Sequence, residues 1–355
     1  MKRFKHALTV AGLFAAVFLF ISVLEPAPRL LAAKSDITLS ESKITIDEGE
    51  KLTIRAVTKG KGKLKWKSAD KNIAVVSKNG VVRGISAGKT IVTVRFGKKT
   101  VKCRVIVHRK YYSDQIKFIA HRGWHEEYLE NSIEAFGAAI EEGFWGVETD
   151  VRTTSDGVFV LSHNASLWKD GLFEKPADLI DPAEIEGDIG HLTYEQVERL
   201  SGGRIATLED YLALVKDHDI VPVIEVKYLV YPDNLDIPER VSAFLQMIEE
   251  HGLMDRVLII SFSKGYLEEI RRQNADVSLQ LLSKENAVDI PYLKEHGFSL
   301  GWAVKCLDFN VLPYFQQEGI EVSVWVCNSR KETDKALSYH AAHITTDVRL
   351  FVVRE

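Results

Sequence analysis

The chain has 355 residues, of which 46% are hydrophobic, enough for one large domain or two domains with packed cores. Its 3 cysteines, Cys103, Cys306 and Cys327, are few and widely separated, which argues against a disulfide framework and against a cysteine zinc site. The formal net charge of -4 hides an asymmetry, because the stretch from Lys51 to Lys110 holds 18 basic residues and one acid.

Residues 1–35 carry the pattern of an export signal. Lys2, Arg3 and Lys5 precede an uncharged apolar run from Ala7 to Leu24, which is the layout of a secretory signal peptide. Because the run is nearly long enough to cross a bilayer, a membrane anchor is the alternative. We expect an exported protein that is extracellular, at the cell surface or membrane-anchored, and the sequence leaves cleavage open.

Residues 36–110 are predicted to form short strands. Lysines alternate with apolar residues over 63–67, which gives one side of a strand to solvent and the other to a core. The turns NG at 79–80 and FGKK at 96–99 each separate two strand-like runs, as hairpin turns do. Several short strands with frequent turns predict a small all-β sandwich.

The segment WKSADKNIAVVSKNGVVRGISAGKTIVTV resembles the bacterial Ig-like (group 2) module of surface proteins. Its excess of positive charge suits binding to anionic cell-wall polymers or lipid head groups. A solvated spacer would carry the same charges, so both interpretations stay open. We expect no nucleic-acid partner.

From residue 116 to 355, strand-like runs alternate with amphipathic helical runs. The eight runs predicted as strands are FIAHRG, GVETDVR, PVIEVK, VLIISF, SLQLLS, SLGWAV, VSVWVCN and HITTDV. This alternation predicts an α/β fold, a (β/α)8 TIM barrel. Helix starts are predicted at the N-caps Asn131 and Thr207, each followed three residues later by an acid.

The run FVLSHN does not fit the alternation. It follows GVETDVR after only six residues, too few for a parallel crossover, so we predict an antiparallel return strand at the barrel mouth. Residues Ala165–Arg204 then form a long insertion of the kind that serves as a lid. Trp168 and Phe173 either pack inside this insertion or line a lipid-facing surface.

Three acids at strand ends predict a metal site. Glu148 and Asp150 are two residues apart, so both carboxylates point to the same side of one strand, and Glu225 comes from another strand. Converging carboxylates repel one another unless a cation neutralises them, and oxygen ligands select Ca²⁺ or Mg²⁺. Salt bridges to neighbouring Arg or Lys residues are the alternative for each acid.

Two histidines at the same rim, His121 and His163, suit general acid–base catalysis, because histidine titrates near neutral pH. Arg122 offers a planar fork for a phosphate, and a salt bridge at the rim is the alternative role.

The stretch AHRGWHEEYLENSIEAFGAAIEEGFWGVETDVRTTSDGVFVLSHNASL closely resembles the glycerophosphodiester phosphodiesterases. Five motifs of that family occur in order, and the resemblance covers almost all of residues 117–355. The motifs are His121-Arg122-Gly123, Glu130-Asn131, Glu148 with Asp150, His163, and Glu225 with Lys227. The departures are Asn164, Leu129 and Ser132, which stand where the family usually has Asp, Pro and Thr; Asn164 puts the orientation of His163 in doubt.

The resemblance implies a function for each matching residue. Glu148, Asp150 and Glu225 would bind the metal, with Glu130 close to it, and His121 and His163 would be the acid–base pair. Arg122, Lys227 and Trp325 would bind the substrate.

The expected reaction is hydrolysis of a glycerophosphodiester to an alcohol and glycerol phosphate. The resemblance also implies a cyclic glycerol phosphate intermediate, formed by attack of the substrate's own hydroxyl. The alternatives are a phospholipase D-like or phosphoinositide-type lipase on the same barrel, and a catalytically silent surface-binding protein.

Overall fold

A computed structural model describes residues 37–60, 62–228 and 237–352. The predicted signal peptide or anchor lies outside these residues. The chain divides into two compact units, Met1–Arg109 and Lys110–Glu355. None of the helices in the described ranges is both long enough and apolar enough to cross a bilayer.

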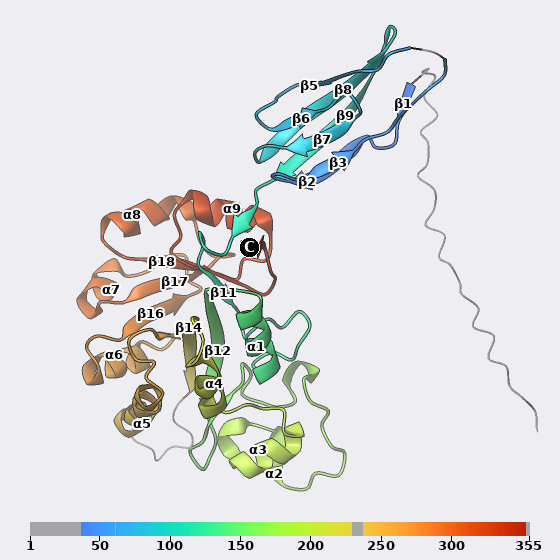
Figure 1. Cartoon of the computed structure of the whole chain (residues 1–355). Helices are drawn as coiled ribbons and strands as arrows, with labels where there is room; N and C mark the ends of the chain where they lie inside the picture. The colour runs from blue at the N-terminus through green and yellow to red at the C-terminus, as the bar shows by residue number, and fades with distance from the viewer. Residues whose placement is uncertain (1–36, 61, 229–236, 353–355) are drawn as a thin grey trace, which may run out of the picture. The chain divides into compact units, whose positions relative to one another are not determined.

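The first unit is a small β-sandwich (Figure 1). Its strands are β1 (Ile37–Leu39), β2 (Lys43–Asp47), β3 (Lys51–Thr53), β4 (Ala56–Thr58), β5 (Lys65–Ser68), β6 (Ala74–Val76), β7 (Val81–Gly84), β8 (Gly88–Phe96) and β9 (Lys99–His108). A four-stranded sheet in the order β2-β9-β8-β5 and a three-stranded sheet β3-β7-β6 enclose an apolar core that includes Ile46, Val82, Val92 and Val105. The alternation of buried and exposed residues along β8 and β9 matches the expected strand period.

Both predicted hairpins are present. Strands β6 and β7 pair antiparallel across the NG turn, and β8 and β9 pair across the second turn. Gly80 has φ +80°, and a Cβ at this position would lie 2.4 Å from the backbone oxygen of Ile54. Only glycine fits there, because other residues would meet both the left-handed strain and the overlap.

The second unit is a closed barrel of eight parallel strands, which confirms the predicted fold class (Figure 1). The strands are β11 (Phe118–Ala120), β12 (Gly146–Thr153), β14 (Val221–Tyr228), β15 (Leu258–Ser261), β16 (Ser278–Ser283), β17 (Ser299–Ala303), β18 (Val322–Trp325) and β19 (Ile344–Thr346). Their order is β11-β19-β18-β17-β16-β15-β14-β12, and β12 pairs with β11 to close the ring. All eight strands fall within the runs predicted from the sequence or overlap them.

The helices lie around the barrel, except the second and third, which belong to the insertion after the return strand. They are α1 (Ile133–Glu141), α2 (Pro182–Glu186), α3 (Tyr194–Ser201), α4 (Leu208–Val215), α5 (Ile237–Glu250), α6 (Lys264–Gln273), α7 (Ile290–His296), α8 (Leu312–Gln317) and α9 (Arg330–Ser338). Thr207 caps α4 in a reciprocal pair with Asp210, as predicted. The prediction for α1 is wrong, because its N-cap is Ser132, whose hydroxyl accepts a hydrogen bond from Ala135 N. Asn131 instead has φ 57° and turns its side chain toward the barrel strands.

The predicted return strand is β13 (Phe159–Leu161), which pairs antiparallel with β12. The insertion that follows has an apolar core of its own, in which Phe173 is buried. Trp168 packs against the same core and donates a hydrogen bond to the Glu184 carbonyl. Both aromatic residues therefore pack inside the insertion.

The barrel unit begins before its first barrel strand. The short strands β10 (Tyr111–Tyr112) and β20 (Phe351–Val352) pair in parallel. Tyr111 is 1% exposed and its ring lies 6.1 Å from that of Phe118, so this tyrosine belongs to the barrel core.

Candidate active site at the carboxyl ends of the barrel strands

Three carboxylates converge inside the barrel. Glu148 and Asp150 lie on β12, and Glu225 lies opposite Asp150 on β14. Their exposed fractions are 2%, 0% and 6%, and the potential ligand oxygens all lie within 4.8 Å of one another. The period of the strand explains the convergence, because Val147 and Val151 point the other way into the core between strands and helices.

Two cations pair with this cluster. Lys227 Nζ lies 3.1 Å from Asp150 Oδ1 and 2.7 Å from Glu225 Oε1. Arg122 Nε lies 3.3 Å from Asp150 Oδ2, and its Nη1 donates to Glu130 Oε2 at 2.8 Å. Glu130 therefore contacts Arg122 and is not a member of the carboxylate cluster.

The carboxylates differ in their electrostatic surroundings. Burial raises the pKa of Glu148 well above its usual value, and the charges of Asp150 and Glu225 raise it further. Burial and the charge of Asp150 likewise raise the pKa of Glu225, to about 7. Burial also disfavours ionised Asp150, but Lys227 and Arg122 outweigh it and lower the pKa of that carboxyl.

The cluster fits a hard divalent cation. When all three buried carboxylates are ionised, their charge exceeds that of the two paired cationic side chains, so a further cation is needed to keep all three ionised. Glu148 Oε2 accepts a hydrogen bond from Arg122 N at 2.8 Å, whereas the buried Oε1 has no hydrogen-bond partner among the described residues. An unsatisfied buried carboxylate oxygen beside two other carboxylates is a ligand atom suited to Ca²⁺ or Mg²⁺.

Asn131 holds the central acid in position. Its Nδ2 donates to Asp150 Oδ2 at 2.9 Å, and its Oδ1 accepts from the Thr149 hydroxyl at 2.9 Å and from Asp150 N at 3.1 Å. All these atoms are buried, so the network orients Asp150 rigidly. This role is not apparent from the sequence, in which the position of Asn131 predicts a helix cap.

His121 follows β11 and has a carboxylate partner that the sequence reasoning did not assign. Its Nδ1 lies 2.6 Å from Asp347 Oδ1, just after β19. Although burial disfavours ionised Asp347, its hydrogen bond with His121 and the charge of that ring lower its pKa to about 2. A third histidine, His125, lies 3.6 Å from the same carboxylate and contacts the His121 carbonyl through Nδ1 at 2.7 Å.

His163 lies after β13, on the hairpin that β12 begins. Burial lowers the pKa of His163 to about 4, and Lys227, Arg122 and His121 lower it against the opposing effect of Asp150. Arg152 donates to the His163 carbonyl at 2.7 Å, which supports the backbone of this turn. Asn164 donates its side-chain amide to Asp170 at 3.0 Å.

Aromatic and basic side chains lie beside the carboxylates. Trp325, at the end of β18, meets Phe262 edge to face with ring centres 5.6 Å apart. Lys227 Nζ lies 6.0 Å from the centre of the Phe262 ring, and Lys284 Nζ lies 4.9 Å from it. The buried Trp325 Nε1 has no acceptor within the described ranges, so it is available to a ligand oxygen.

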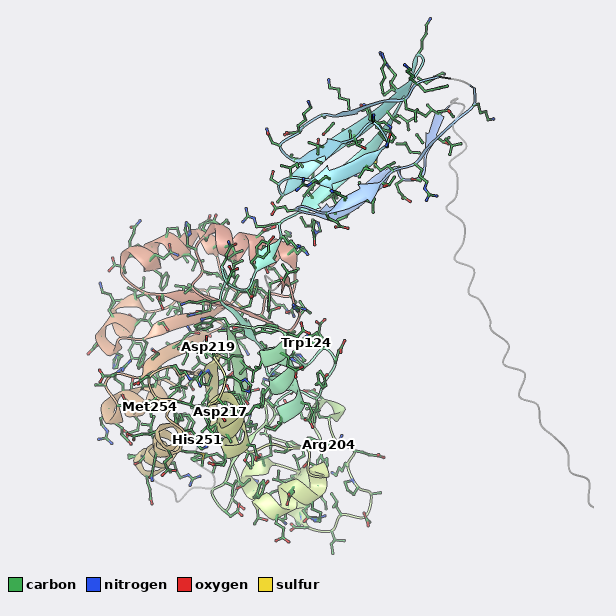
Figure 2. All side chains as sticks on the ribbon, in the orientation of Figure 1. Trp124, Arg204, Asp217, Asp219, His251 and Met254 are labelled. Carbon is green, nitrogen blue, oxygen red and sulfur yellow. The ribbon has the colours of Figure 1, made fainter. Side chains whose placement is uncertain are left out.

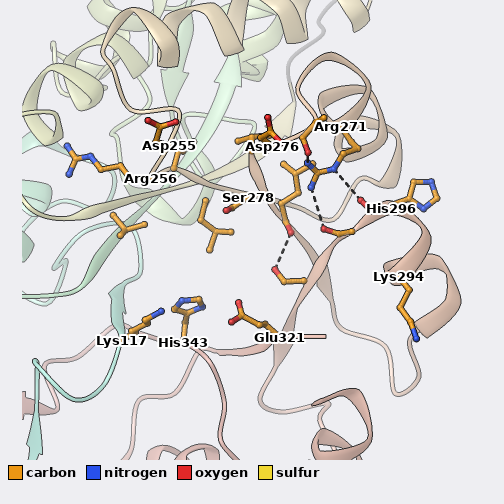
Figure 3. A pocket seen from close by; sticks show the side chains of 18 of the residues that line it. Lys117, Asp255, Arg256, Arg271, Asp276, Ser278, Lys294, His296, Glu321 and His343 are labelled. Atoms are coloured by element: carbon orange, nitrogen blue, oxygen red, sulfur yellow. Dashed lines mark hydrogen bonds between the residues drawn. The ribbon is translucent and has the colours of Figure 1, made fainter. Parts of the chain in front are cut away.

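A large cavity lies elsewhere in the barrel unit. A cavity of about 860 Å³ is lined by residues at the amino ends of the barrel strands, among them Lys117, Ser278 and His343 (Figure 3). Arg271 of this cavity stabilises the fold, because it donates hydrogen bonds to the backbone carbonyls of His296 and Gly297, as the dashed lines show. In a TIM barrel, function resides at the carboxyl ends of the strands, where the acids and histidines lie.

Two regions of the chain match known protein families. Residues 121–349 match the model of the Glycerophosphoryl diester phosphodiesterase family, and residues 35–107 match that of the Bacterial Ig-like domain (group 2). A glycerophosphodiester phosphodiesterase of Caldanaerobacter subterraneus is 26% identical over 64% of this chain and 93% of its own length. One from Bacillus altitudinis is 30% identical over 48% of this chain and 67% of its own.

Solved structures show the same fold. A glycerophosphodiester phosphodiesterase from Parabacteroides distasonis is 26% identical with a TM-score of 0.54, over 65% of this chain and 92% of that chain. An Oleispira antarctica phosphodiesterase in complex with its product sn-glycerol-3-phosphate is 19% identical with a TM-score of 0.56, over the same shares of 65% and 92%. At that identity the second structure supports the fold alone.

Proposed function

The chain belongs to the glycerophosphoryl diester phosphodiesterase family, and we propose that its barrel hydrolyses glycerophosphodiesters to an alcohol and glycerol phosphate with a divalent cation and two histidines. The observation that carries the proposal is the buried cluster of Glu148, Asp150 and Glu225 at the barrel mouth. The retention of this cluster together with both histidines speaks against a silent barrel.

The three acids would hold Ca²⁺ or Mg²⁺. Such an ion, when bound, supplies Lewis-acid polarisation of the phosphoryl group and screens its charge from the acids. Arg122 and Lys227 would then be released from part of their pairing with Asp150 and would hold the phosphate oxygens. Trp325 and Phe262 would contact the glycerol or the alcohol, with Trp325 Nε1 as donor.

His121 would accept the first proton. Its Nδ1 faces Asp347, which assigns the hydrogen to Nδ1, leaves the lone pair on Nε2, and stabilises the imidazolium that forms. The hydroxyl next to the ester would lose its proton to His121 and attack phosphorus, while the bond to the alcohol breaks. His163, protonated as the anionic substrate binds, would give its proton to the leaving alcohol.

Water then opens the cyclic glycerol phosphate by the reverse transfers. In this second half His163 removes the proton of water and His121 protonates the glycerol oxygen that leaves phosphorus. The tethered hydroxyl is favoured over water in the first half because its attack is intramolecular, an advantage on the order of 7 kcal/mol in ideal cases.

The test compares a glycerophosphodiester with its 2-deoxy analogue in the presence of Ca²⁺ or Mg²⁺. We expect turnover of the first, almost none of the second, and a cyclic phosphate signal in phosphorus NMR with a slow variant. Equal rates on both substrates, with no cyclic signal, would show direct attack by water. The complete absence of glycerophosphodiester turnover with either ion would refute the proposed activity.

An exposed apolar pair favours a second candidate, a lipase action on the same barrel. Ile180 and Ile185, in the insertion after β13, are 91% and 41% exposed. Exposed isoleucines of this kind would be sheltered by an acyl chain. Faster turnover of lysophospholipids than of their deacylated head groups would favour this candidate, and Ile180→Asn should then remove the preference.

We also propose that the chain is exported, with residues 1–35 as signal peptide or anchor, 36–110 as the Ig-like domain and 116–355 as the catalytic domain. The apolar run at 7–24 supports export. The basic Ig-like domain would attach the enzyme to an anionic cell-wall polymer or to lipid head groups. Fractionation of the producing cells tests the location, and recovery in the cytosol would refute it.

A further inference from the structure

One side of the four-stranded Ig-like sheet is covered by basic side chains. Alternate residues of β2, β9, β8 and β5 point outward and are exposed or half-buried, while the residues between them face the core. We call the six central basic residues the cationic sheet face: Lys43, Lys65, Lys67, Arg95, Lys102 and Arg104. Lys89 extends it along β8, and Asp47, at the end of β2, is the one acid at an outward position of these strands. Figure 2 shows nitrogen-tipped side chains projecting outward from this unit.

The strand register places like charges side by side. Lys43 lies directly opposite Arg104, and Lys65 lies directly opposite Arg95. Directly opposite like charges destabilise a sheet. No salt bridge joins any of the six to an acid within the described residues. These residues therefore do not stabilise the sandwich, and a bound anion would relieve their repulsion.

The spacing suits a polymer with repeated charges. Neighbouring strands are about 4.8 Å apart, and alternate residues along a strand are about 6.7 Å apart. Thr93 lies between Lys67 and Lys102 in one cross-strand row, and its hydroxyl donates to the Lys67 carbonyl at 3.2 Å, which leaves the lysines and arginines as the donors to an anion. Weak contacts repeated at this spacing add up along a linear polyanion.

A hydrated polymer fits the face better than a bilayer does. Surfaces that insert into lipid carry exposed aromatic or large apolar side chains. The aromatic residue of β5, Trp66, points away from solvent and packs against the core. Two large apolar residues lie on the outward side, Ile91, which is 41% exposed, and Ile106, which is half-buried. Basic residues outnumber these two isoleucines, so the chemistry of the face is mainly charge and hydrogen bonding.

We propose that the cationic sheet face binds a linear polyanion whose charges are phosphodiesters. The choice of phosphodiester among anions rests on the proposed function, since a polymer of that chemistry would also present bonds that the barrel can cleave. The attachment raises the local concentration of such bonds for the tethered barrel.

The test measures binding of a labelled poly(glycerol phosphate) oligomer to the full chain with excess chelator, so that binding is separated from hydrolysis. The face variant is K65Q/K67Q/K102Q/R104Q. The matched control, K51Q/K71Q/K78Q/R83Q, removes the same charge from exposed positions outside the four-stranded sheet. Circular dichroism and turnover of glycerophosphocholine, measured without chelator, verify that both variants fold.

We expect the face variant to bind the oligomer at least about 30-fold more weakly and the control less than about threefold. The slope of log affinity against log salt should be about −4 for the unaltered chain, from about −0.7 per phosphate contact, and should shrink by about 3 in the face variant alone. Equal weakening in both variants would show that net charge acts without a defined surface and would overturn the proposal.

The same binding measurement is made with vesicles of phosphatidylglycerol and phosphatidylcholine, which test a membrane as the partner. If they bind more tightly than the oligomer, and the face variant alone loses them, the partner is a membrane and the polymer assignment is wrong. Oligomer binding with no turnover of any glycerophosphodiester would refute the proposed activity and leave the binding surface in place. Turnover of a glycerophosphodiester without oligomer binding would refute the binding surface and leave the proposed activity in place.

Discussion

The side chains that orient the candidate catalytic groups are not the ones with the most obvious chemistry. Asn131 makes three buried hydrogen bonds around Asp150 and Thr149. Arg122 has φ 57°, a strained conformation for a non-glycine residue, and in it the Arg122 amide donates to Glu148. Such strain costs on the order of 1–3 kcal/mol and persists where neighbouring contacts require it. Asn131, the second residue of the Glu130-Asn131 motif, thus positions Asp150, a proposed metal ligand.

Removal of one carboxylate should abolish metal binding and turnover together. We expect chelation, Glu148→Gln, Asp150→Asn and Glu225→Gln each to lower kcat/KM by about 100-fold or more, because the phosphodiester cannot approach the acids without a cation. Calorimetric titration of Ca²⁺ and Mg²⁺ measures binding apart from activity. Glu295→Gln, at the other end of the barrel, is the control. Full activity in excess chelator would contradict this prediction.

Asp347→Asn should slow the reaction without removing either histidine. Asp347, whose pKa is about 2, is ionised across the working pH range, so its loss removes the partner of the His121 imidazolium. We expect kcat/KM to fall by about 100-fold or more and its pH profile to move, because the charge that stabilises the imidazolium is gone. Asp308→Asn, at an exposed helix cap, is the control. An unchanged pH profile would show that Asp347 is only structural.

At the level of the elements, strand register brings the site together. The parallel pairing of β12 with β14 puts Asp150 opposite Glu225. A slip of either strand by one residue would turn its acids away from the barrel interior, toward the core between strands and helices. The antiparallel return of β13 brings the turn with His163 back to the end of the strand that carries the acids. Two acids and one histidine therefore depend on a single hairpin.

Gly80→Ala should destabilise the Ig-like unit and leave the barrel intact. We expect a loss of about 2–4 kcal/mol, from left-handed strain together with the overlap on the Ile54 carbonyl. Gly97→Ala is the matched control: it has φ +58° and no neighbour within 4 Å, so the strain alone should cost about 1 kcal/mol. Hydrogen exchange over β6–β7 measures the stability of the Ig-like unit, and hydrogen exchange over the barrel strands measures the stability of the barrel. Equal losses in the two variants would contradict the packing argument.

At the scale of the whole molecule, the two units separate charge. The Ig-like unit holds most of the uncompensated basic residues, and the barrel holds most of the acids, including those proposed to bind metal. A basic unit attracts polyanions, whereas an acidic barrel repels them until a cation binds. Placing the proposed polyanion binding in one unit and the proposed metal binding in the other avoids this conflict.

A chain of Lys110–Glu355 should retain turnover of a soluble glycerophosphodiester within about twofold, because each unit has its own core. The comparison is a chain of Ser113–Glu355, which lacks Tyr111. Loss of this buried aromatic residue should cost about 3 kcal/mol or more in the free energy of unfolding. Denaturant unfolding of the two fragments checks the difference. Equal stabilities would show that β10 contributes nothing to the barrel.

The sequence by itself determined the elements and the direction of their side chains. Eight strand runs, the return strand and the two Ig-like hairpins follow from periods of two and from turn residues, which are local properties. The same period placed Glu148 and Asp150 on one side of their strand, and the order of the motifs indicated the family.

Tertiary structure alone decided which distant residues meet. Asp347 contacts His121 across 226 positions, Lys227 bridges Asp150 and Glu225, and Tyr111 packs into the barrel. The cationic sheet face likewise exists only once the strand order β2-β9-β8-β5 is known. Periodicity specifies which way a side chain points, but the pairing of strands far apart in the chain specifies its neighbour, and a single sequence contains no direct measure of that pairing.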